Sequence, residues 1–237
     1  MSRPLYTRNS LRYWLPHVRA LRIPHPRTVV VPIGDWWSEM LDGKAPPDSA
    51  ARRLQSIADQ LGYPLFVRTD YMSGKHDYDH ACHLACREDL FRNIYNLFEA
   101  HGMAFMVEDP TAICFREWLT LDAAFKSFDG LPIAREWRLF ANGGVSMCQH
   151  PYWPEEALAE SWRFGSVAPA GWRDLLAAMY EQPPPQMAVD WALRLTRRLG
   201  GAWSVDVACD KDGRWWLIDT AEADRSWHPA HEEETAC

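Results

Sequence analysis

The chain lacks the features that mark membrane and secreted proteins. No apolar run approaches the roughly 20 residues of a transmembrane helix, so we expect no membrane span. The basic N-terminus is not followed by a continuous apolar segment, which argues against a cleaved secretory signal. None of the six cysteines forms a CxxC pair. Reduced thiols and a cytoplasmic location are therefore the simpler expectation.

Several marks of common functional classes are also missing. The wider glycine spacing and the GKS or GKT ending of a P-loop are absent, so a P-loop fold is not supported. A net charge of −7 makes nucleic acid an unlikely general partner. No Ser-His-Asp or Cys-His arrangement occurs at a recognisable spacing, so no side-chain nucleophile is expected.

Acidic residues are absent from the first 34 positions, which carry six arginines. A basic surface facing an acidic substrate or a nucleic-acid end is one interpretation. The simpler one is a segment that docks on the acidic body of the same protein. Apolar residues at helical spacing favour docking; they are Leu11, Trp14, Leu15, Val18 and Leu21.

What is present indicates a folded protein of the α+β class. Its 237 residues, 47% hydrophobic with 13 tryptophans, can bury a sizeable core in one large or two modest domains. Periodicity predicts helices over residues 49–61, 87–101, 169–180 and 186–199, with Asp48 as the first cap and Gly62 and Gly102 as stops. Strands are predicted over residues 28–33, 64–67, 105–107, 111–121, 133–141, 145–152, 203–208 and 214–219.

The first group with chemical potential follows the strand that ends on Arg68. A short polar turn leads to Ser73-Gly74-Lys75. Gly74 allows close backbone approach, and the N–H groups around it can point at an anion. Arg68 and Lys75 would add two positive charges, so the segment can cradle a triphosphate.

Two further groups lie on predicted strands. Alternation places Glu136 and Arg138 on one face of their strand and Trp137 on the other. In the closing hairpin, Asp206 and Asp219 face each other, and such carboxylates repel unless a cation such as Mg²⁺ lies between them. The alternatives are a turn or cap role for Asp219 and a surface position on an edge strand for Asp206.

The order of these segments resembles the ATP-grasp superfamily over roughly residues 62–227. In that family a basic residue on a strand and a glycine loop with a Lys contact phosphate, which here correspond to Arg68 and to Ser73, Gly74 and Lys75. A linker strand then lies beside the adenine, which the segment from Phe115 to Leu119 matches, with Glu117, Trp118 and Leu119 at the base. An Arg and a closing acidic hairpin follow, which Arg138, Asp206 and Asp219 match.

The resemblance implies two α+β lobes that grip a nucleotide, over residues 61–237, after a small N-terminal region of residues 1–60. It implies ATP and Mg²⁺ as cofactors and a ligase that joins a carboxylate to an amine or thiol through an acylphosphate. Lys75 and Arg138 would be the catalytic residues. Both substrates are left open, including a peptide or protein.

Two departures from the family pattern bear on activity. Arg68 stands where Lys is commoner, as in a clade of bacteria and phages, and Arg keeps phosphate binding. Ala221 stands where the family has an Asn metal ligand. Glu222 is a candidate replacement ligand, although its strand parity is wrong. A nucleotide-binding or interaction module without catalysis is therefore the alternative.

A histidine cluster follows the glycine loop. His76, His80 and His83 would share one face of a helix and could bind Zn²⁺, with Cys82 and Cys86 nearby. The spacing fits no common zinc-finger framework. Histidines that line a substrate pocket, or plain surface histidines, are the other two interpretations.

Overall fold

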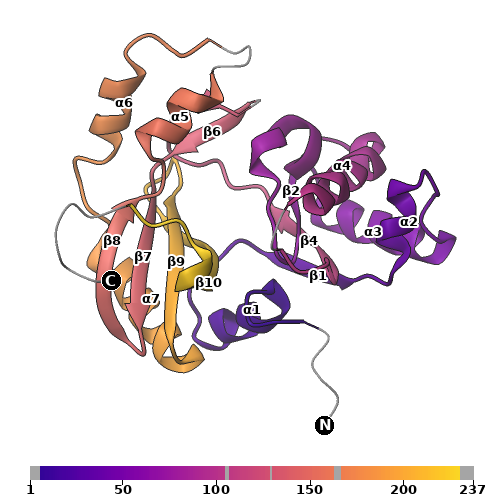
Figure 1. Ribbon diagram of the computed structural model, residues 1–237, viewed down its shortest axis with the longest axis horizontal. Helices are drawn as coiled ribbons and strands as arrows, with labels where there is room; N and C mark the ends of the chain where they lie inside the picture. Colours follow the sequence, from indigo (N-terminus) through magenta and orange to yellow (C-terminus); the bar gives the residue numbers. More distant parts are fainter. Residues whose placement is uncertain (1–5, 105–106, 129, 163–166, 230–237) are drawn as a thin grey trace. The chain divides into compact units, whose positions relative to one another are not determined.

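The computed structural model describes residues 6–104, 107–128, 130–162 and 167–229, apart from the side chain of His76 (Figure 1). The chain divides into two compact units. Unit 1 contains Met1–Arg12, Pro26–Leu119 and Phe128–Leu131. Unit 2 contains Tyr13–His25, Thr120–Ser127 and Pro132–Cys237. The expected boundary after residue 60 stays a prediction.

Unit 1 is built on a four-stranded antiparallel sheet in the order β1-β4-β2-β3. The strands are β1 (Thr28–Pro32), β2 (Leu65–Thr69), β3 (His83–Leu84) and β4 (Ala112–Glu117). Its helices are α2 (Trp36–Leu41), α3 (Asp48–Leu61) and α4 (Leu90–Met103), with short turns of 3₁₀ helix at Lys75–Asp77 and Arg87–Asp89 and of π helix at Tyr78–Cys82.

The hydrophobic core of unit 1 lies between α3, α4 and one face of this sheet. Alternation places every second strand residue on that face. The helices contribute apolar residues at helical spacing, which buries one stripe of each. Core members from these elements are Leu54, Ala58, Leu65, Val67, Ile94, Leu97, Phe98, Ile113 and Phe115.

Unit 2 is built on a second antiparallel sheet, in the order β10-β9-β7-β8. Its strands are β7 (Glu136–Asn142), β8 (Val145–Pro151), β9 (Ala202–Cys209) and β10 (Trp215–Glu222). Helix α7 (Gln186–Leu199) contacts β7, β8 and β9. The smaller elements are β5 (Ala123–Ser127), α5 (Glu155–Ser161), α6 (Trp172–Met179) and a 3₁₀ turn at Ala223–Arg225. Helix α1 (Leu11–Ala20) and strand β6 (Leu131–Ala134) belong to unit 2 except for their first residues, Leu11, Arg12 and Leu131.

The two faces of the unit 2 sheet differ in character. Trp137 and Leu139 on β7 are in register with Val207 and Val205 on β9, and all four are buried. The alternate residues of both strands, among them Arg138 and Asp206, project from the other face. The predicted alternation on the strand that carries Arg138 is thus confirmed.

Most predicted elements are confirmed, with their ends shifted. Helix α7 covers the predicted residues 186–199, and α3 ends before Gly62, whose φ is 83°. Three details were wrong. Gly102 lies inside α4, which ends at Met103. Asp48 lies in the first turn of α3, and Pro47 is the cap residue. The strand predicted over residues 133–141 is two strands that break at Arg135.

Two further predictions meet the limits of the described residues. The predicted strand over residues 105–107 lies mostly outside them. Among the described residues, no helix combines the length and apolar character needed to cross a bilayer.

The expectation of reduced cysteines is met only in part. Free thiols are found at Cys82, Cys86, Cys114 and Cys209, whereas Cys148 is disulfide-bonded.

Candidate functional site

A row of polar side chains crosses the unit 2 sheet from edge to edge. His150 on β8 is opposite Arg138 on β7, Arg138 is opposite Asp206 on β9, and Asp206 is opposite Asp219 on β10. Directly opposed residues on antiparallel strands project from the same face. The fold therefore places one cation beside two carboxylates on the face opposite the one that carries Trp137 and Leu139.

Arg138 and Asp206 form a two-pronged ion pair at the centre of this row. Arg138 Nε donates to Asp206 Oδ1 at 2.8 Å, and Nη2 donates to Oδ2 at 2.9 Å. The side chains are 15% and 5% exposed, so the pair is strongly shielded from water. Burial alone would lower the pKa of Arg138, but the charge and hydrogen bonds of Asp206 raise it above its ordinary value.

Asp219 reaches the row through an irregularity in β10. Leu217 is opposite Val207, but Asp219 is opposite Asp206, so Ile218 is an extra residue in the ladder. A regular ladder continued from Leu217 would place Asp219 opposite Val205, on the apolar face. The β-bulge turns the carboxylate toward Asp206 instead. Asp219 Oδ1 accepts a hydrogen bond from the Thr220 backbone N–H at 3.0 Å.

Ala221 and Glu222 follow on the same strand. Ala221 is opposite Ser204, so it projects from the same face as Asp219, two residues away. Glu222 is opposite Trp203, and its Cβ leaves the strand on the other side. The register therefore keeps Glu222 out of the row, and its assignment as a metal ligand stays a prediction.

In unit 1, Arg68 lies on the sheet face opposite the α3 and α4 core. It is opposite Cys114 in the ladder, is 3% exposed, and donates from Nε to the Thr69 carbonyl at 3.0 Å. Arg116 on β4 projects from the same face and is 6% exposed. The sequence interpretation missed Arg116, although its alternation with Phe115 was a usable signal.

The backbone conformation and packing at position 74 explain why the loop carries a glycine there. Gly74 adopts φ 65°, in the left-handed region that side chains avoid. A Cβ there would lie 2.8 Å from Leu97 Cδ2 of α4. Lys75 begins the 3₁₀ turn that follows, and its charge acts on the nearby buried Cys82. Burial raises the pKa of Cys82 to about 12, which disfavours the thiolate form that a nucleophilic cysteine needs.

The predicted adenine strand ends in two local contacts. Glu117 exchanges hydrogen bonds with the backbone of Arg27: Oε1 accepts from the Arg27 N–H at 2.6 Å, and the Glu117 N–H donates to the Arg27 carbonyl at 2.9 Å. Trp118 lies 4.5 Å from the His83 ring and 6.1 Å from the Tyr78 ring, between centroids. Leu119 ends the unit 1 segment.

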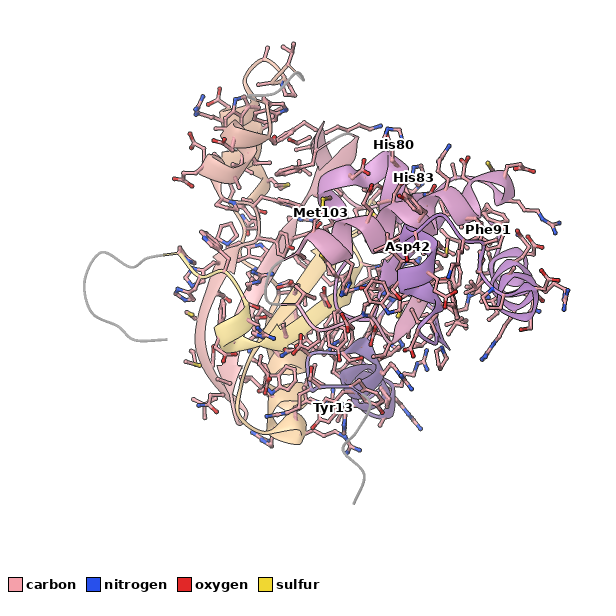
Figure 2. The ribbon with its side chains drawn as sticks, turned by 45° about the vertical axis from the view of Figure 1, so that its right-hand side comes forward. Tyr13, Asp42, His80, His83, Phe91 and Met103 are labelled. Atoms are coloured by element: carbon pink, nitrogen blue, oxygen red, sulfur yellow. The ribbon has the colours of Figure 1, made fainter. Side chains whose placement is uncertain are left out.

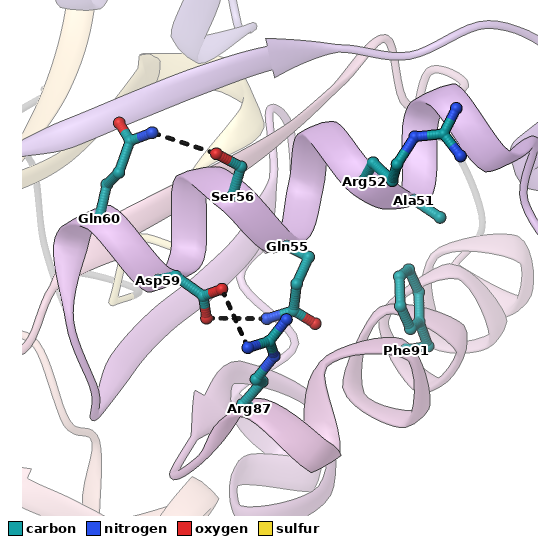
Figure 3. A pocket seen from close by; sticks show the side chains of 8 residues that line it. All are labelled: Ala51, Arg52, Gln55, Ser56, Asp59, Gln60, Arg87 and Phe91. Carbon is teal, nitrogen blue, oxygen red and sulfur yellow. Dashed lines mark hydrogen bonds and ion pairs between the residues drawn. The ribbon is translucent and has the colours of Figure 1, made fainter.

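Two further candidate features of unit 1 are its histidines and a groove between two helices. His80 is exposed (Figure 2). His83 Nδ1 lies 3.4 Å from Asp79 Oδ1. Among the described side chains, Cys148, His150 and His228 are the one group of three or more His, Cys, Asp or Glu residues whose ligand atoms lie close enough to share a metal ion. The side chain of His76 lies outside the described residues, so a zinc site at His76, His80 and His83 stays a prediction. An open groove of about 650 Å³ runs between α3 and α4 and carries an Arg87–Asp59 ion pair (Figure 3).

The structure thus brings part of the predicted site together. Arg138, Asp206 and Asp219 are neighbours in unit 2. Glu222 belongs to the same unit but projects from the other face of the sheet. The remaining predicted positions belong to unit 1, and these are Arg68, Ser73, Gly74, Lys75, Glu117, Trp118 and Leu119. His150, at the end of the row, was missed because its strand register is not visible in the sequence.

Comparisons with known proteins give matches by structure. Neither a protein-family model nor a curated protein matches the sequence. Two structures of Cdc123 from Schizosaccharomyces pombe match with a TM-score of 0.57. The first, a C-terminally truncated form, is 14% identical over 90% of this chain and 82% of that chain. The second is 17% identical over 93% and 87%.

Two ligase or synthase structures match less well. The ATP-grasp ligase PsnB with its minimal precursor is 12% identical over 90% of this chain and 52% of that one, with a TM-score of 0.46. N5-carboxyaminoimidazole synthase from Aspergillus clavatus, with ADP and 5-aminoimidazole ribonucleotide, is 15% identical over 90% and 44%, with a TM-score of 0.48. At these identities a likeness concerns the fold alone.

The predicted fold class is confirmed. The chain is α+β, and each of its two units is built on a four-stranded antiparallel sheet.

Proposed function

We propose that this chain binds ATP with Mg²⁺ and uses them to ligate a carboxylate to an amine or thiol through an acylphosphate. The observation that carries the proposal is the row of Arg138, Asp206 and Asp219 on one face of the unit 2 sheet. Phosphoryl transfer to a substrate carboxylate needs positioned cations and carboxylate-held Mg²⁺ and no nucleophile from a protein side chain.

The donor set fits a hard cation. A carboxylate offers about four lone-pair sites, so Asp206 can accept from Arg138 at both oxygens and still coordinate a metal. Asp219, one strand away, supplies a second oxygen ligand of the kind that Mg²⁺ prefers. In this proposal, Asp206 and Asp219 would hold Mg²⁺, which would supply charge neutralisation for the phosphates, and Asp206 orients Arg138 through the ion pair.

Unit 1 is assigned the phosphate contacts. Arg68 and Lys75 are the proposed cations, and Ser73 and Gly74 the proposed backbone donors. The segment from Phe115 to Leu119, which includes Glu117 and Trp118, is the proposed adenine contact.

The phosphate assignment is tested by ATP binding to Lys75→Ala, measured by isothermal titration calorimetry. We expect binding to weaken by about 1–3 kcal/mol, the range for loss of a charge-assisted hydrogen bond. The matched control is Lys44→Ala, because Lys44 is a mostly exposed lysine of the same unit. Equal ATP affinity in the two folded variants would rule out the cradle.

The metal assignment is tested by the effect of Mg²⁺ on melting temperature, with and without ATP. Mg²⁺ should stabilise the wild type, more strongly with ATP, because it binds the native arrangement. Asp219→Asn should lose most of that stabilisation and nearly all ADP release, whereas Asp212→Asn, in the exposed turn of the same hairpin, should lose neither. If Mg²⁺ changes neither melting temperature nor nucleotide affinity in the wild type, the ligase proposal fails.

One observation favours a second candidate, nucleotide binding without ligation. Ala221 projects from the metal face at the position where the resemblance expects Asn, and Glu222 projects from the other face. If this candidate is right, the wild type binds Mg²⁺ and ATP, releases no ADP with mixed small-molecule and peptide acceptors, and gains Mg²⁺ affinity in Ala221→Asn. ADP release above the Asp219→Asn background would reject it.

A further inference from the structure

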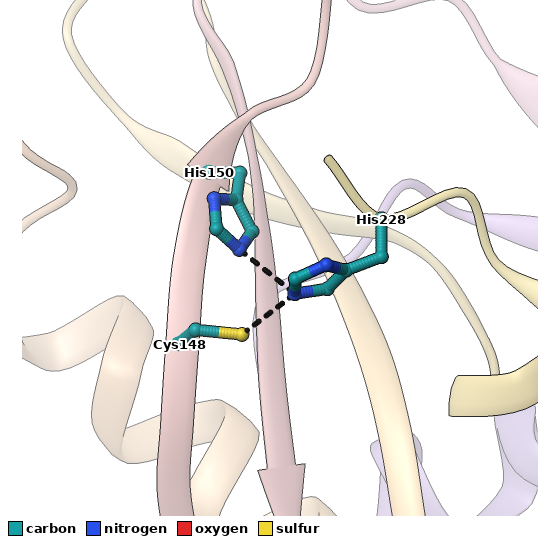
Figure 4. Close-up of side chains that lie close together, drawn as sticks. All are labelled: Cys148, His150 and His228. Carbon is teal, nitrogen blue, oxygen red and sulfur yellow. Dashed lines mark hydrogen bonds between the residues drawn. The ribbon is translucent and has the colours of Figure 1, made fainter. Parts of the chain in front are cut away.

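A second cluster of ligand-type atoms lies on the unit 2 sheet, at the β8 end of the polar row, with which it shares His150. It consists of Cys148 and His150 on β8 and of His228, which follows β10 (Figure 4). His228 Nε2 is 3.0 Å from His150 Nε2 and 3.1 Å from Cys148 Sγ. All three ligand atoms lie within 4.8 Å of one another, and all three residues are half-buried.

The tautomer of His228 points its acceptor nitrogen into the cluster. Its Nδ1 is 2.7 Å from the Pro229 carbonyl, which can only accept, so Nδ1 carries the proton. The Nε2 lone pair therefore faces His150 and Cys148. A ring nitrogen held in this way by a backbone carbonyl is the usual arrangement of a metal-binding histidine.

The segment that carries His228 is held across the sheet by successive residues. Ser226 Oγ is 2.6 Å from Ser204 Oγ on β9, and the Trp227 carbonyl accepts from Arg138 Nη1 on β7 at 3.2 Å. The His228 ring then lies edge-on to Phe140, with centroids 4.8 Å apart. These contacts position the imidazole before any ligand arrives, which lowers the entropy cost of binding.

We propose that reduction of Cys148 creates a zinc site formed by Cys148, His150 and His228, with water as the fourth ligand. Zn²⁺ favours a tetrahedral set of thiolate and imidazole ligands, whereas Mg²⁺ favours oxygen. The site is thus chemically distinct from the carboxylates of the polar row. Because Cys148 is disulfide-bonded in this structure, its sulfur is a poor ligand until the bond is broken.

A phosphine can reduce the disulfide bond of Cys148. The phosphine attacks the disulfide and takes an oxygen atom from water, which yields two thiols and a phosphine oxide. Zn²⁺ then displaces the thiol proton of Cys148 to solvent, and the imidazoles of His150 and His228 bind as neutral ligands.

The experiment titrates the full chain with Co²⁺ and Zn²⁺, with and without tris(2-carboxyethyl)phosphine. The reduced wild type should bind one ion per chain and show the thiolate-to-cobalt charge-transfer band and visible bands of tetrahedral Co²⁺. Cys148→Ser should lose the charge-transfer band. His150→Ala and His228→Ala should each weaken Zn²⁺ binding at least about tenfold. The matched controls are Cys86→Ser and His80→Ala, which change a half-buried thiol and an exposed imidazole of unit 1.

Melting temperature gives a second readout, which also shows that each variant is folded. Zn²⁺ should raise the melting temperature of the reduced wild type and of both controls more than that of the three ligand variants. Failure of the reduced wild type to bind Zn²⁺, equal binding by His228→Ala, or a charge-transfer band that persists in Cys148→Ser would each overturn the proposal. An Asp219→Asn protein should bind Zn²⁺ normally, so this result does not depend on the proposed ATP site.

Discussion

At the scale of single residues, the buried carboxylate of Asp70 connects three segments of unit 1: the end of β2, Ser10, and the start of β4. It follows β2 and is fully buried. Its oxygens accept from Ser10 Oγ at 2.6 Å, from Thr111 Oγ1 at 2.7 Å, and from the N–H groups of Thr111 and Ala112 at 2.9 and 3.0 Å. Ser10 Oγ in turn accepts from the Arg12 N–H at 3.1 Å, as an N-cap of α1 does.

Asp70→Ala should destabilise the protein by about 3 kcal/mol, because several buried donors would lose their acceptor together. Urea unfolding measures this loss. Asp70→Asn should cost less, because its amide oxygen still accepts. The control is Asp42→Ala, an exposed residue for which we expect a change within about 0.5 kcal/mol. Similar losses in the Asp42 and Asp70 variants would contradict this role for Asp70.

Residue types were visible in the sequence, but their partners were not. Arg138, Asp206 and Asp219 were predicted as functional from their chemistry and order. That Asp206 forms a two-pronged ion pair with Arg138 depends on the register of β7 against β9, between residues 68 positions apart. Local periodicity carries no information on such a register.

At the scale of elements, the loop before the first 3₁₀ turn combines two constraints on one glycine. Gly74 has a positive φ and packs against Leu97 of α4. Gly143, in the β7–β8 turn, has a similar φ of 57° with no atom within 4 Å of an added Cβ. The pair therefore separates backbone strain from packing.

Gly143→Ala should cost about 1 kcal/mol, the cost of placing a Cβ in the left-handed region. Gly74→Ala should cost more, because Leu97 must also move. Chemical unfolding of both variants measures the difference. Equal losses would mean that the Leu97 contact relaxes freely.

Strongly periodic elements were predicted well, whereas short or irregular ones were not. Helices α3 and α7 carry a clear apolar stripe and matched their predicted spans closely. Helix α2, with six residues, and α5, with seven, are too short to show a period. The π turn at Tyr78–Cys82 and the bulge at Ile218 add a residue to a regular pattern, which no periodicity reveals.

At the scale of the whole molecule, two histidines with a lowered pKa, His101 and His17, predict how stability varies with pH. Burial lowers the pKa of His101 below its ordinary 6.5 and outweighs the opposite effect of the Glu108 carbonyl. That carbonyl is 2.7 Å from Nε2, which therefore carries the proton of a neutral ring. Burial, with Arg198 nearby, also lowers the pKa of His17.

The free energy of unfolding should therefore fall as the pH drops below about 6.5, because the unfolded chain takes up protons first. Above that pH the contribution of these histidines is fully present. Denaturant unfolding at a series of pH values checks the slope, which should be shallower in His101→Gln. His80→Gln, at an exposed histidine, should keep the wild-type slope. A slope unchanged in His101→Gln would contradict the assignment.

The extra residue in β10 also has a consequence for sequence alignment. Up to Leu217, the residues of β10 pair with β9 in one register, and from Asp219 onward they pair in a register shifted by one residue. A sequence alignment that counts residues from the turn of this hairpin, without a gap, would therefore align Asp219 with positions whose side chains project from the apolar face of the sheet. A one-residue gap at Ile218 instead aligns Asp219 and Ala221 with successive positions on the polar face, which carries Asp206. Distant relatives of this hairpin are therefore best sought with the gap placed there.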